Sequence, residues 1–260
     1  MDLGLAGRKA IICGSSRGLG FACAKALVAE GARVVINGRN PEAVDAAARQ
    51  LAAAFPGAAV DVCAADVATD SGRRELAEKH PDADILVNNA AGPPPGDFRS
   101  WTREHWIAAL DLNMISAIDM TRRVIDAMIS RGFGRIINIT SSAVKAPIGP
   151  LGLSNGARAG LTGFMSGLAR DVAAKGVTIN NLLPGSFDTD RLRAAHATIA
   201  AARGVDPAAF REGARMAIPM MRFGDPAEFG AVCAFLCSAQ AAYITAQNVL
   251  LDGGAYPGSF

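Results

Sequence analysis

The strongest constraint on the fold is a glycine-rich turn between a short apolar run and a helical segment. Residues 9–13 read Lys-Ala-Ile-Ile-Cys, which is typical of a buried strand, and residues 19–30 have the pattern of a helix. Between them the chain reads Gly14-Ser15-Ser16-Arg17-Gly18-Leu19-Gly20. Glycines let a backbone turn sharply and approach a pyrophosphate, while the next helix presents free N–H groups at its positive end. The turn therefore predicts a dinucleotide site.

Short β-branched runs alternate with longer helical patterns along the chain, which favours a parallel sheet with helices on both faces. The predicted strands lie at 9–13, 33–36, 59–63, 85–87, 135–139, 177–182 and 248–251. The predicted helices lie at 19–30, 41–55, 71–79, 103–131, 153–175 and 226–238. We therefore expect one α/β domain over residues 1–260, a Rossmann-type doubly wound parallel seven-stranded sheet, with a helical substrate lid at about 188–219.

Charge and composition argue against several other functions. The net charge is +2 and the basic residues are spread along the chain, so we expect no nucleic-acid partner and no anionic membrane partner. No apolar run is long enough to span a bilayer, and the first residues do not resemble a signal peptide, so a cytoplasmic location is expected. The five cysteines fit neither a disulfide framework nor a zinc site, so we predict no metal.

The spacing of the glycine-rich turn, Gly-x-x-x-Gly-x-Gly, resembles that of the short-chain dehydrogenase/reductase family. Other segments resemble the family's motifs in the same order, and they are Asp66-Val67, Asn88-Asn89-Ala90-Ala91-Gly92, Asn113, Ile139-Thr140-Ser141-Ser142, Pro184-Gly185 with Thr189, Arg222-Phe223-Gly224 and Leu251-Asp252-Gly253-Gly254. The 3-oxoacyl-acyl-carrier-protein reductase branch is the most similar. The resemblance implies a nicotinamide-dependent oxidoreductase that forms homodimers or homotetramers.

The resemblance also implies which residues contact the dinucleotide, namely Gly14, Ser16, Arg17, Gly18, Leu19, Gly20, Arg39, Asp66, Val67, Asn89, Ala90, Arg158, Pro184, Gly185 and Thr189. The end of the second strand lacks the carboxylate with which many NAD enzymes bind the ribose hydroxyls. Arg39 stands there instead, and Arg17 lies in the glycine-rich turn. Because arginine pairs with a 2′-phosphate, we expect NADP(H) to be preferred over NAD(H).

The family's catalytic Tyr-x-x-x-Lys pair is replaced here by Ser154 and Arg158, followed by the family-like segment Ala159-Gly160-Leu161-Thr162-Gly163-Phe164. Arg158 can hold the nicotinamide ribose and supply positive charge, but a guanidinium releases no proton near neutral pH. Ser154 is too short to reach the place of a phenol and is a much weaker acid. Because general acid–base catalysis typically raises the reaction rate 10²–10⁴-fold, we expect ordinary ketone reduction to be severely impaired.

Other residues of the expected active site are retained or have a candidate substitute. Asn113 matches the family's asparagine, and Ser142 matches its serine, with Ser141 as the close alternative. Lys145, in the loop beside the substrate pocket, is the best local candidate for a replacement proton donor. The sequence places none of three further groups at the substrate, namely His196, Tyr243 and Tyr256.

Two functions are compatible with this pattern. The first is a divergent NADP(H)-dependent oxidoreductase that acts on a small-molecule carbonyl or an acyl-thioester substrate with a conjugated double bond, and that uses a non-standard proton donor. The second is a catalytically silent family member that binds NADP(H) and serves as a sensor or as an oligomer partner. The intact glycine-rich turn and the chain-wide resemblance favour the first slightly over the second.

Overall fold

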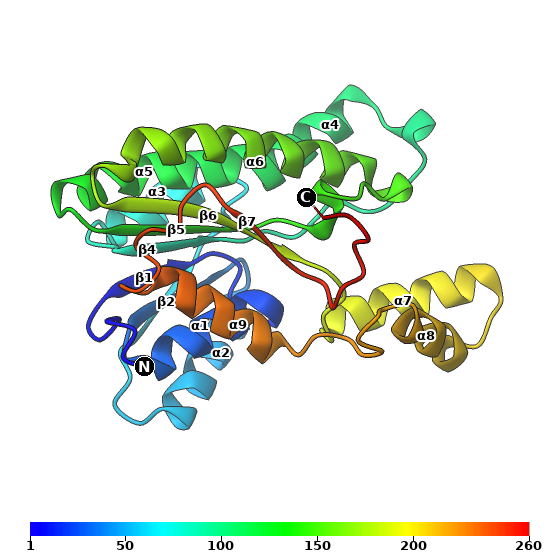
Figure 1. The fold of residues 1–260 in the computed structure, drawn as a ribbon, viewed down its shortest axis with the longest axis horizontal. Helices are drawn as coiled ribbons and strands as arrows, with labels where there is room; N and C mark the ends of the chain where they lie inside the picture. Colours follow the sequence, from blue (N-terminus) through cyan, green and yellow to red (C-terminus); the bar gives the residue numbers. More distant parts are fainter. Residues whose placement is uncertain (260) are drawn as a thin grey trace.

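A computed structural model describes residues 1–259 and confirms the predicted α/β architecture (Figure 1). Within these residues one parallel sheet of seven strands has the order β3-β2-β1-β4-β5-β6-β7. The strands are β1 (Lys9–Ile12), β2 (Arg33–Gly38), β3 (Val60–Ala64), β4 (Ile85–Asn88), β5 (Gly134–Ile139), β6 (Val177–Pro184) and β7 (Asn248–Leu251). The strand order reverses between β1 and β4, and in doubly wound sheets the ligand crevice lies at the carboxyl ends of such strands.

Helices cover both faces of the sheet (Figure 1). One face carries α1 (Gly18–Ala29), α2 (Pro41–Ala54) and α9 (Pro226–Cys237). The other face carries α3 (Asp70–Lys79), α5 (Ser116–Ser130) and α6 (Gly152–Ala173), and α4 (Arg103–Leu110) leads into α5. The cores of the two faces contain fully buried side chains such as Phe229 and Met165, each of which stabilises the fold by about 1.5–3 kcal/mol.

The predicted elements agree with the observed ones to within two residues at each end, with one exception. The helical stretch predicted at 103–131 is confirmed, but a π-helical segment, Asp111–Ile115, lies within it and joins α4 to α5. The chain remains helical through this segment, so helix propensity alone does not reveal it. The segment places Asn113 beneath the carboxyl end of β4, where its side chain is buried.

Four asparagines form a ladder across the neighbouring strands β4, β5, β6 and β7. The Asn88 side chain donates to Asn138 Oδ1 at 2.9 Å, Asn138 donates to Asn181 at 2.9 Å, and Asn181 donates to Asn248 at 2.8 Å. Each pair is also in register in the sheet. A buried amide is costly unless its donors and acceptors are paired, so the ladder fixes the relative positions of these strands near the crevice.

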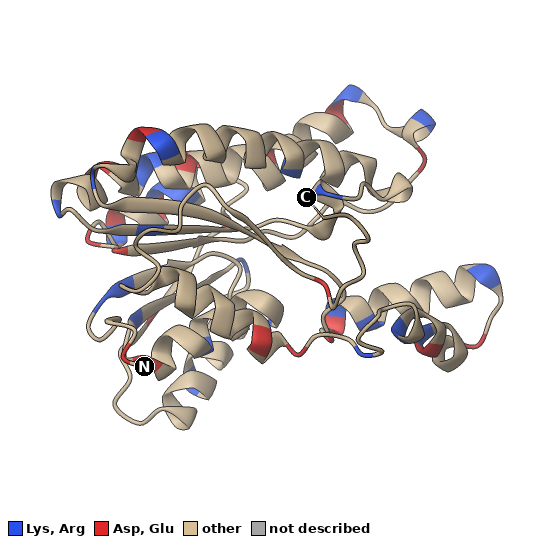
Figure 2. Cartoon of the chain, viewed as in Figure 1, with Lys and Arg blue, Asp and Glu red and all other residues tan. Residues whose placement is uncertain are grey.

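The predicted lid contains two helices, α7 (Asp190–Arg203) and α8 (Pro207–Met216), which project beyond the edge of the sheet (Figure 1). The Asp188 carboxylate at its base accepts hydrogen bonds from both Arg193 and Arg211. Charges of both signs are interspersed over the lid and the rest of the molecule (Figure 2). Among residues 1–259, no helix combines the length and the apolar character needed to cross a membrane.

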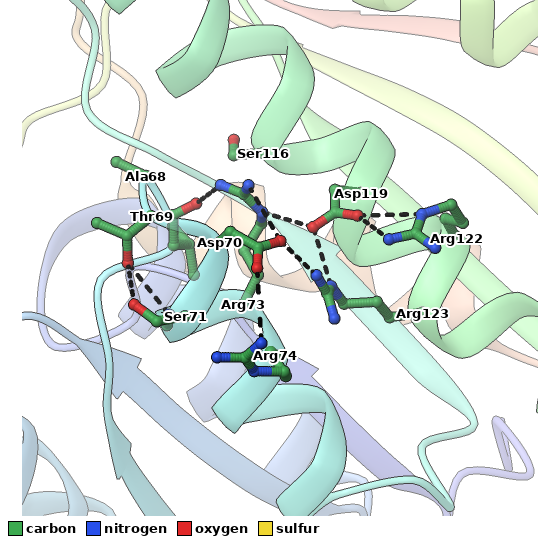
Figure 3. A network of polar contacts seen from close by, with 12 residues as sticks. Ala68, Thr69, Asp70, Ser71, Arg73, Arg74, Ser116, Asp119, Arg122 and Arg123 are labelled. Carbon is green, nitrogen blue, oxygen red and sulfur yellow. Dashed lines mark hydrogen bonds and ion pairs between the residues drawn. The ribbon is translucent and has the colours of Figure 1, made fainter.

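An ion-pair network joins α3 to α5 (Figure 3). The Asp119 carboxylate accepts hydrogen bonds from Arg73 at 2.7 Å, Arg122 at 2.6 Å and Arg123 at 2.9 Å. Burial raises the pKa of Asp119, but the three guanidinium groups outweigh it and lower the pKa to about 2. Arg73 also donates to the Val67 carbonyl at 2.9 Å, so the network holds the loop after β3.

Candidate functional site

The glycine-rich turn leads directly from β1 into α1, as predicted. Gly14 and Gly18 have φ angles of +56° and +61°, and residues other than glycine rarely adopt backbone conformations in this region. A Cβ at Gly20 would lie 2.4 Å from the Gly14 carbonyl oxygen and 2.8 Å from Asn89 Nδ2, so no other residue fits there. The turn is therefore a closely packed cradle in front of the N-terminus of α1, and its shape fits a dinucleotide pyrophosphate.

The end of β2 closes one side of this cradle. The Asn37 side chain accepts from the Gly14 N–H at 3.2 Å and donates to the Cys63 and Ala65 carbonyls, both at 3.0 Å. Ser16 Oγ lies 3.3 Å from where a Cβ of Gly38 would be. Arg17 and Arg39 are both exposed near this end of the cradle, and within residues 1–259 neither is paired with a carboxylate. The two guanidinium groups are thus available to an anionic ligand.

The loops after β3 and β4 form the adjoining wall. Asp66 accepts a hydrogen bond from the Ala68 N–H at 3.0 Å, and Val67 is buried beside it. Asn89 donates to the Gly14 carbonyl at 2.9 Å, which ties the loop after β4 to the glycine-rich turn. Ala90 follows on the same wall, and Leu19 is half-buried in the first turn of α1.

The residues predicted after β6 lie across the crevice from these loops. Pro184 ends β6, and the Gly185 N–H donates to the Leu251 carbonyl at 2.8 Å. Thr189 caps α7 by accepting from the Leu192 N–H at 3.3 Å. Its methyl group lies 4.0 Å from where a Cβ of Gly18 would be, so the base of the lid approaches the cradle. The structure therefore brings the predicted cofactor residues together around one crevice.

Asn113 lies behind this crevice, and only one of the two polar atoms of its side chain makes a hydrogen bond within the described residues. Its amide nitrogen donates to the Ala91 carbonyl at 2.7 Å, whereas its Oδ1 is buried without a hydrogen-bond partner in the described residues. A small cavity lined by Asn88, Asn113, Ser116 and Arg158 adjoins it and has room for about one water molecule. The position suits an asparagine that orders a water molecule next to the active site.

The loop after β5 carries the serine pair and Lys145. Ser141 Oγ accepts from the Ala143 N–H at 3.1 Å and caps a short 3₁₀ turn, Ser142–Val144. No hydrogen bond within residues 1–259 involves the half-buried Ser142 hydroxyl. Lys145 is also half-buried, and its Nζ lies 5.6 Å from the centre of the Tyr256 ring. The carboxyl-terminal segment thus returns to the loop that contains the predicted proton donor.

Ser154 and Arg158 lie one helical turn apart on α6 and contact each other. Arg158 Nε donates to Ser154 Oγ at 3.1 Å, and its two terminal nitrogens donate to the Ile139 carbonyl at 2.8 Å and the Ala90 carbonyl at 3.3 Å. Burial, followed by the nearby charge of Arg191, lowers the pKa of Arg158 to about 10. The guanidinium remains protonated at neutral pH, and it holds a fixed positive charge between β4 and β5.

Two of the three other proton-donor candidates lie elsewhere. The His196 ring packs in the lid against Phe210 and Phe223, with ring centres 5.4 and 5.6 Å away. Burial, with the charge of Arg211, lowers the pKa of His196. The Tyr243 side chain is fully exposed near the start of β7. Only Tyr256, through its contact with Lys145, borders the loop after β5.

One charged residue of this site, Arg191 at the start of α7, was not among the predicted residues. A Cβ at Gly92 would lie 2.9 Å from Arg191 Nη2 and 3.7 Å from Ser154 Oγ. Arg191 and Ser154 therefore flank the same small space next to Gly92. The only sequence signal for Arg191 was its position two residues after Thr189. That position does not indicate in which direction the Arg191 side chain points.

Comparisons with known proteins agree with this geometry. The sequence profile described as Enoyl-(Acyl carrier protein) reductase matches residues 14–256. An acetoacetyl-CoA reductase of Allochromatium vinosum is 35% identical over 96% of this chain and 98% of its own length. A 3-oxoacyl-acyl-carrier-protein reductase of Vibrio cholerae is 31% identical over 98% of this chain and 99% of its own.

Solved structures show the same arrangement of elements. The crystal structure of L-sorbose reductase from Gluconobacter frateurii, complexed with NADPH and L-sorbose, superposes with a TM-score of 0.93. It is 31% identical and covers 98% of both chains. The likeness therefore extends over nearly the whole chain, and it includes both the glycine-rich turn and the helix that carries Ser154 and Arg158.

Proposed function

Because this chain belongs to the short-chain dehydrogenase/reductase family, we propose that it is an NADP(H)-dependent oxidoreductase acting on a carbonyl or a conjugated thioester with a non-standard proton donor. One observation carries the proposal. In the turn, Gly14 and Gly18 have positive φ angles and Gly20 has no room for a Cβ, and Cys13 and Asn89, which adjoin the turn, line the small cavity that also holds Asn113 and Arg158. A cradle of this shape next to a buried positive charge suits a bound dinucleotide.

The preference for NADP(H) rests on the charges at the end of β2. Arg17 and Arg39 are exposed there, and β2 ends without a carboxylate that would repel a phosphate. A charge-assisted hydrogen bond from either guanidinium to a 2′-phosphate would favour NADP(H) over NAD(H). The L-sorbose reductase, whose structure contains NADPH, is in line with this preference.

The residues on the substrate side of the site favour a hydride acceptor whose reduction depends little on general acid catalysis. When bound, NADPH supplies a hydride, that is two electrons and one hydrogen nucleus, and becomes NADP⁺. Transfer of that hydride to the β-carbon of a conjugated thioester would move an electron pair onto the substrate's carbonyl oxygen. The hydroxyl of Ser142 would donate a hydrogen bond to that oxygen, and the Arg158 charge would stabilise the enolate. Lys145 would then give a proton to the α-carbon and regain one from water.

A ketone makes a larger demand on the same residues. Its oxygen must take a full proton as the hydride arrives, and the Ser154 hydroxyl already accepts a hydrogen bond from Arg158. Ser154 is also a much weaker acid than a phenol. We therefore expect conjugated thioesters to be reduced faster than 3-oxo thioesters.

Turnover with two coenzyme A esters tests the proposal. The protein is mixed with NADPH and either crotonyl-CoA or acetoacetyl-CoA, and NADPH absorbance is followed. We expect crotonyl-CoA to be consumed faster. Lys145→Ala and Ser142→Ala should each lower kcat/KM about 100-fold without weakening NADPH binding. Ser141→Ala is the matched control, and a larger loss there would assign the substrate-facing hydroxyl to Ser141.

The alternative is a catalytically silent NADP(H)-binding protein that acts as a sensor or oligomer partner. The bond between Ser154 and Arg158 favours it, because it leaves no acid at the family's tyrosine position. Large exposed apolar side chains of α4, the π-helical segment and α6, namely Ile107, Ile115 and Phe164, support association into a homodimer or homotetramer. An NADPH-dependent rise in Tm without turnover of any conjugated or 3-oxo thioester would support this alternative over catalysis.

A further inference from the structure

Arg191 reaches back from the lid to the space beside Gly92 and Ser154. It is the second residue of α7, and a Cβ at Gly92 would lie 2.9 Å from its Nη2 and 3.8 Å from its Cζ. Ser154 Oγ lies 3.7 Å from the same point. The loop after β4, helix α6 and the lid therefore meet at this spot, and the missing side chain of Gly92 leaves the room for the guanidinium.

Within residues 1–259 the exposed Arg191 side chain has no counter-charge. Three other arginines of the lid are paired with carboxylates, since Arg193 and Arg211 bind Asp188 and Arg215 binds Glu212, whereas Arg203 lies over the Phe210 ring. In the described part of the chain, by contrast, Arg191 makes neither a hydrogen bond nor an ion pair. Its charge acts instead on Arg158, whose pKa it helps to lower. Two positive charges next to the Ser154 hydroxyl make this spot favourable for an anion.

Ser154 adds a hydrogen-bond donor to the same space. Its Oγ accepts from Arg158 Nε, so its own O–H hydrogen remains free to donate. A guanidinium and a hydroxyl that converge near a buried positive charge match the oxygens of a carboxylate. The positions that would hold a phenol thus form a small site for an anion.

We propose that Arg191 and Ser154, backed by Arg158, bind a carboxylate of the substrate close to the reacting carbon. The inference rests on the proposed reductase function, and among the acceptors of that reaction it favours those that carry a carboxylate within a few bonds of the carbonyl or double bond. A phosphate group of the dinucleotide could also bind Arg191 through its anionic oxygens. The test therefore separates a substrate carboxylate from a cofactor phosphate.

Binding of a matched pair of unreactive ligands provides the test. Monomethyl succinate carries one carboxylate, and dimethyl succinate is its neutral counterpart. Their Kd values are measured by calorimetry on the protein saturated with NADP⁺, so the result does not depend on turnover. We expect the half-ester to bind about 10- to 100-fold more tightly than the diester, because charge-assisted hydrogen bonds form only with the half-ester.

Variants of two lid arginines then assign the effect. Arg191→Ala should remove the preference for the half-ester while the Kd values of the diester and of NADP⁺ stay unchanged, and Arg191→Lys should retain part of the preference. Arg193→Ala, on the same helix but paired with Asp188 and Asp190, should leave all three Kd values unchanged.

Three results would overturn the inference. They are equal or undetectable binding of the two ligands to the unaltered protein, a preference that survives Arg191→Ala, and a loss of NADP⁺ affinity in Arg191→Ala that would assign the guanidinium to a cofactor phosphate. Absence of NADPH-dependent turnover would instead contradict the proposed reductase function and leave this binding result intact.

Discussion

Arg158 donates a hydrogen bond of 3.1 Å from its Nε to the Oγ of Ser154. The two positions that depart from the Tyr-x-x-x-Lys pattern therefore contact each other across one turn of α6. The guanidinium is further held by the Ile139 and Ala90 carbonyls, so its orientation is fixed. The pair provides a rigid positive charge and a hydroxyl donor, which suits binding an anion better than transferring a proton.

The charge of Arg39 should determine which nicotinamide cofactor binds. Arg39→Ala removes one of the two exposed guanidinium groups at the end of β2. We expect the Kd for NADPH to rise about 10- to 100-fold, since a charge-assisted contact with the 2′-phosphate is lost. The Kd for NADH should change less than about twofold, and fluorescence titration measures both. Arg33→Ala, at the opposite end of β2, is the control, and equal losses for both cofactors would contradict the prediction.

The cradle should not tolerate a methyl group at Gly20. In Gly20→Ala the new Cβ would meet the Gly14 carbonyl oxygen at 2.4 Å, so the turn has to move. We expect the free energy of unfolding to fall by about 1–3 kcal/mol and NADPH binding to weaken at least about 100-fold. Urea unfolding and fluorescence titration measure the two effects.

Gly167→Ala is the matched control for this change. Gly167 lies in α6, and a Cβ there would have no atom within 4 Å. Replacing a helical glycine by alanine typically stabilises by about 1 kcal/mol, so stability should rise while NADPH binding stays the same. If Gly20→Ala binds NADPH as tightly as Gly167→Ala does, the turn is not the pyrophosphate cradle.

The sequence was sufficient to predict the sheet and the cofactor crevice. Buried strands alternate with helical patterns, and the glycine spacing at residues 14–20 leaves few folds to choose from. The π-helical segment around Asn113 was not predictable, because the chain remains helical through it and helix propensity alone does not reveal it. Each asparagine of the ladder appears in sequence as an isolated polar residue, and only the strand register shows that the four are bonded in series.

The catalytic end was predictable only in part. The resemblance predicts that Ser154 and Arg158 stand where the family has a tyrosine and a lysine, but their mutual hydrogen bond depends on rotamers that no pattern specifies. The carbonyls that hold Arg158 come from the ends of two different strands. Arg191 had no signal of its own, because nothing in the sequence indicates that this exposed arginine of α7 lies beside Gly92 and Ser154.

The Asp119 network should stabilise the fold in a pH-dependent way. The folded-state pKa of Asp119 is about 2, against an ordinary value of 3.8, so its contribution is complete above about pH 4 and disappears as the pH falls toward 2. Asp119→Asn should lower the free energy of unfolding at neutral pH by about 2 kcal/mol. Urea unfolding between about pH 2 and pH 7 should also show a flatter pH dependence for the variant.

The control for this measurement lies on the same helix. Asp126 is exposed on α5, so Asp126→Asn should change stability by less than about 0.5 kcal/mol at any of these pH values. A similar loss in both variants would mean that helix charge in general, rather than the pairing of Asp119 with Arg73, Arg122 and Arg123, is responsible.

Restoring the family's pair should restore ketone reduction. In the double variant Ser154→Tyr with Arg158→Lys, a phenol with a pKa near 10 stands beside an ammonium group, and the hydrogen bonds that hold Ser154 to Arg158 are gone. We expect kcat/KM for acetoacetyl-CoA with NADPH to rise about 10²–10⁴-fold, the usual value of a positioned acid. Ser154→Phe with Arg158→Lys has the same ring without the hydroxyl and should show no gain. If the tyrosine variant binds NADPH but reduces acetoacetyl-CoA no faster than the phenylalanine variant, the substrate pocket has itself diverged from that of the ketone reductases.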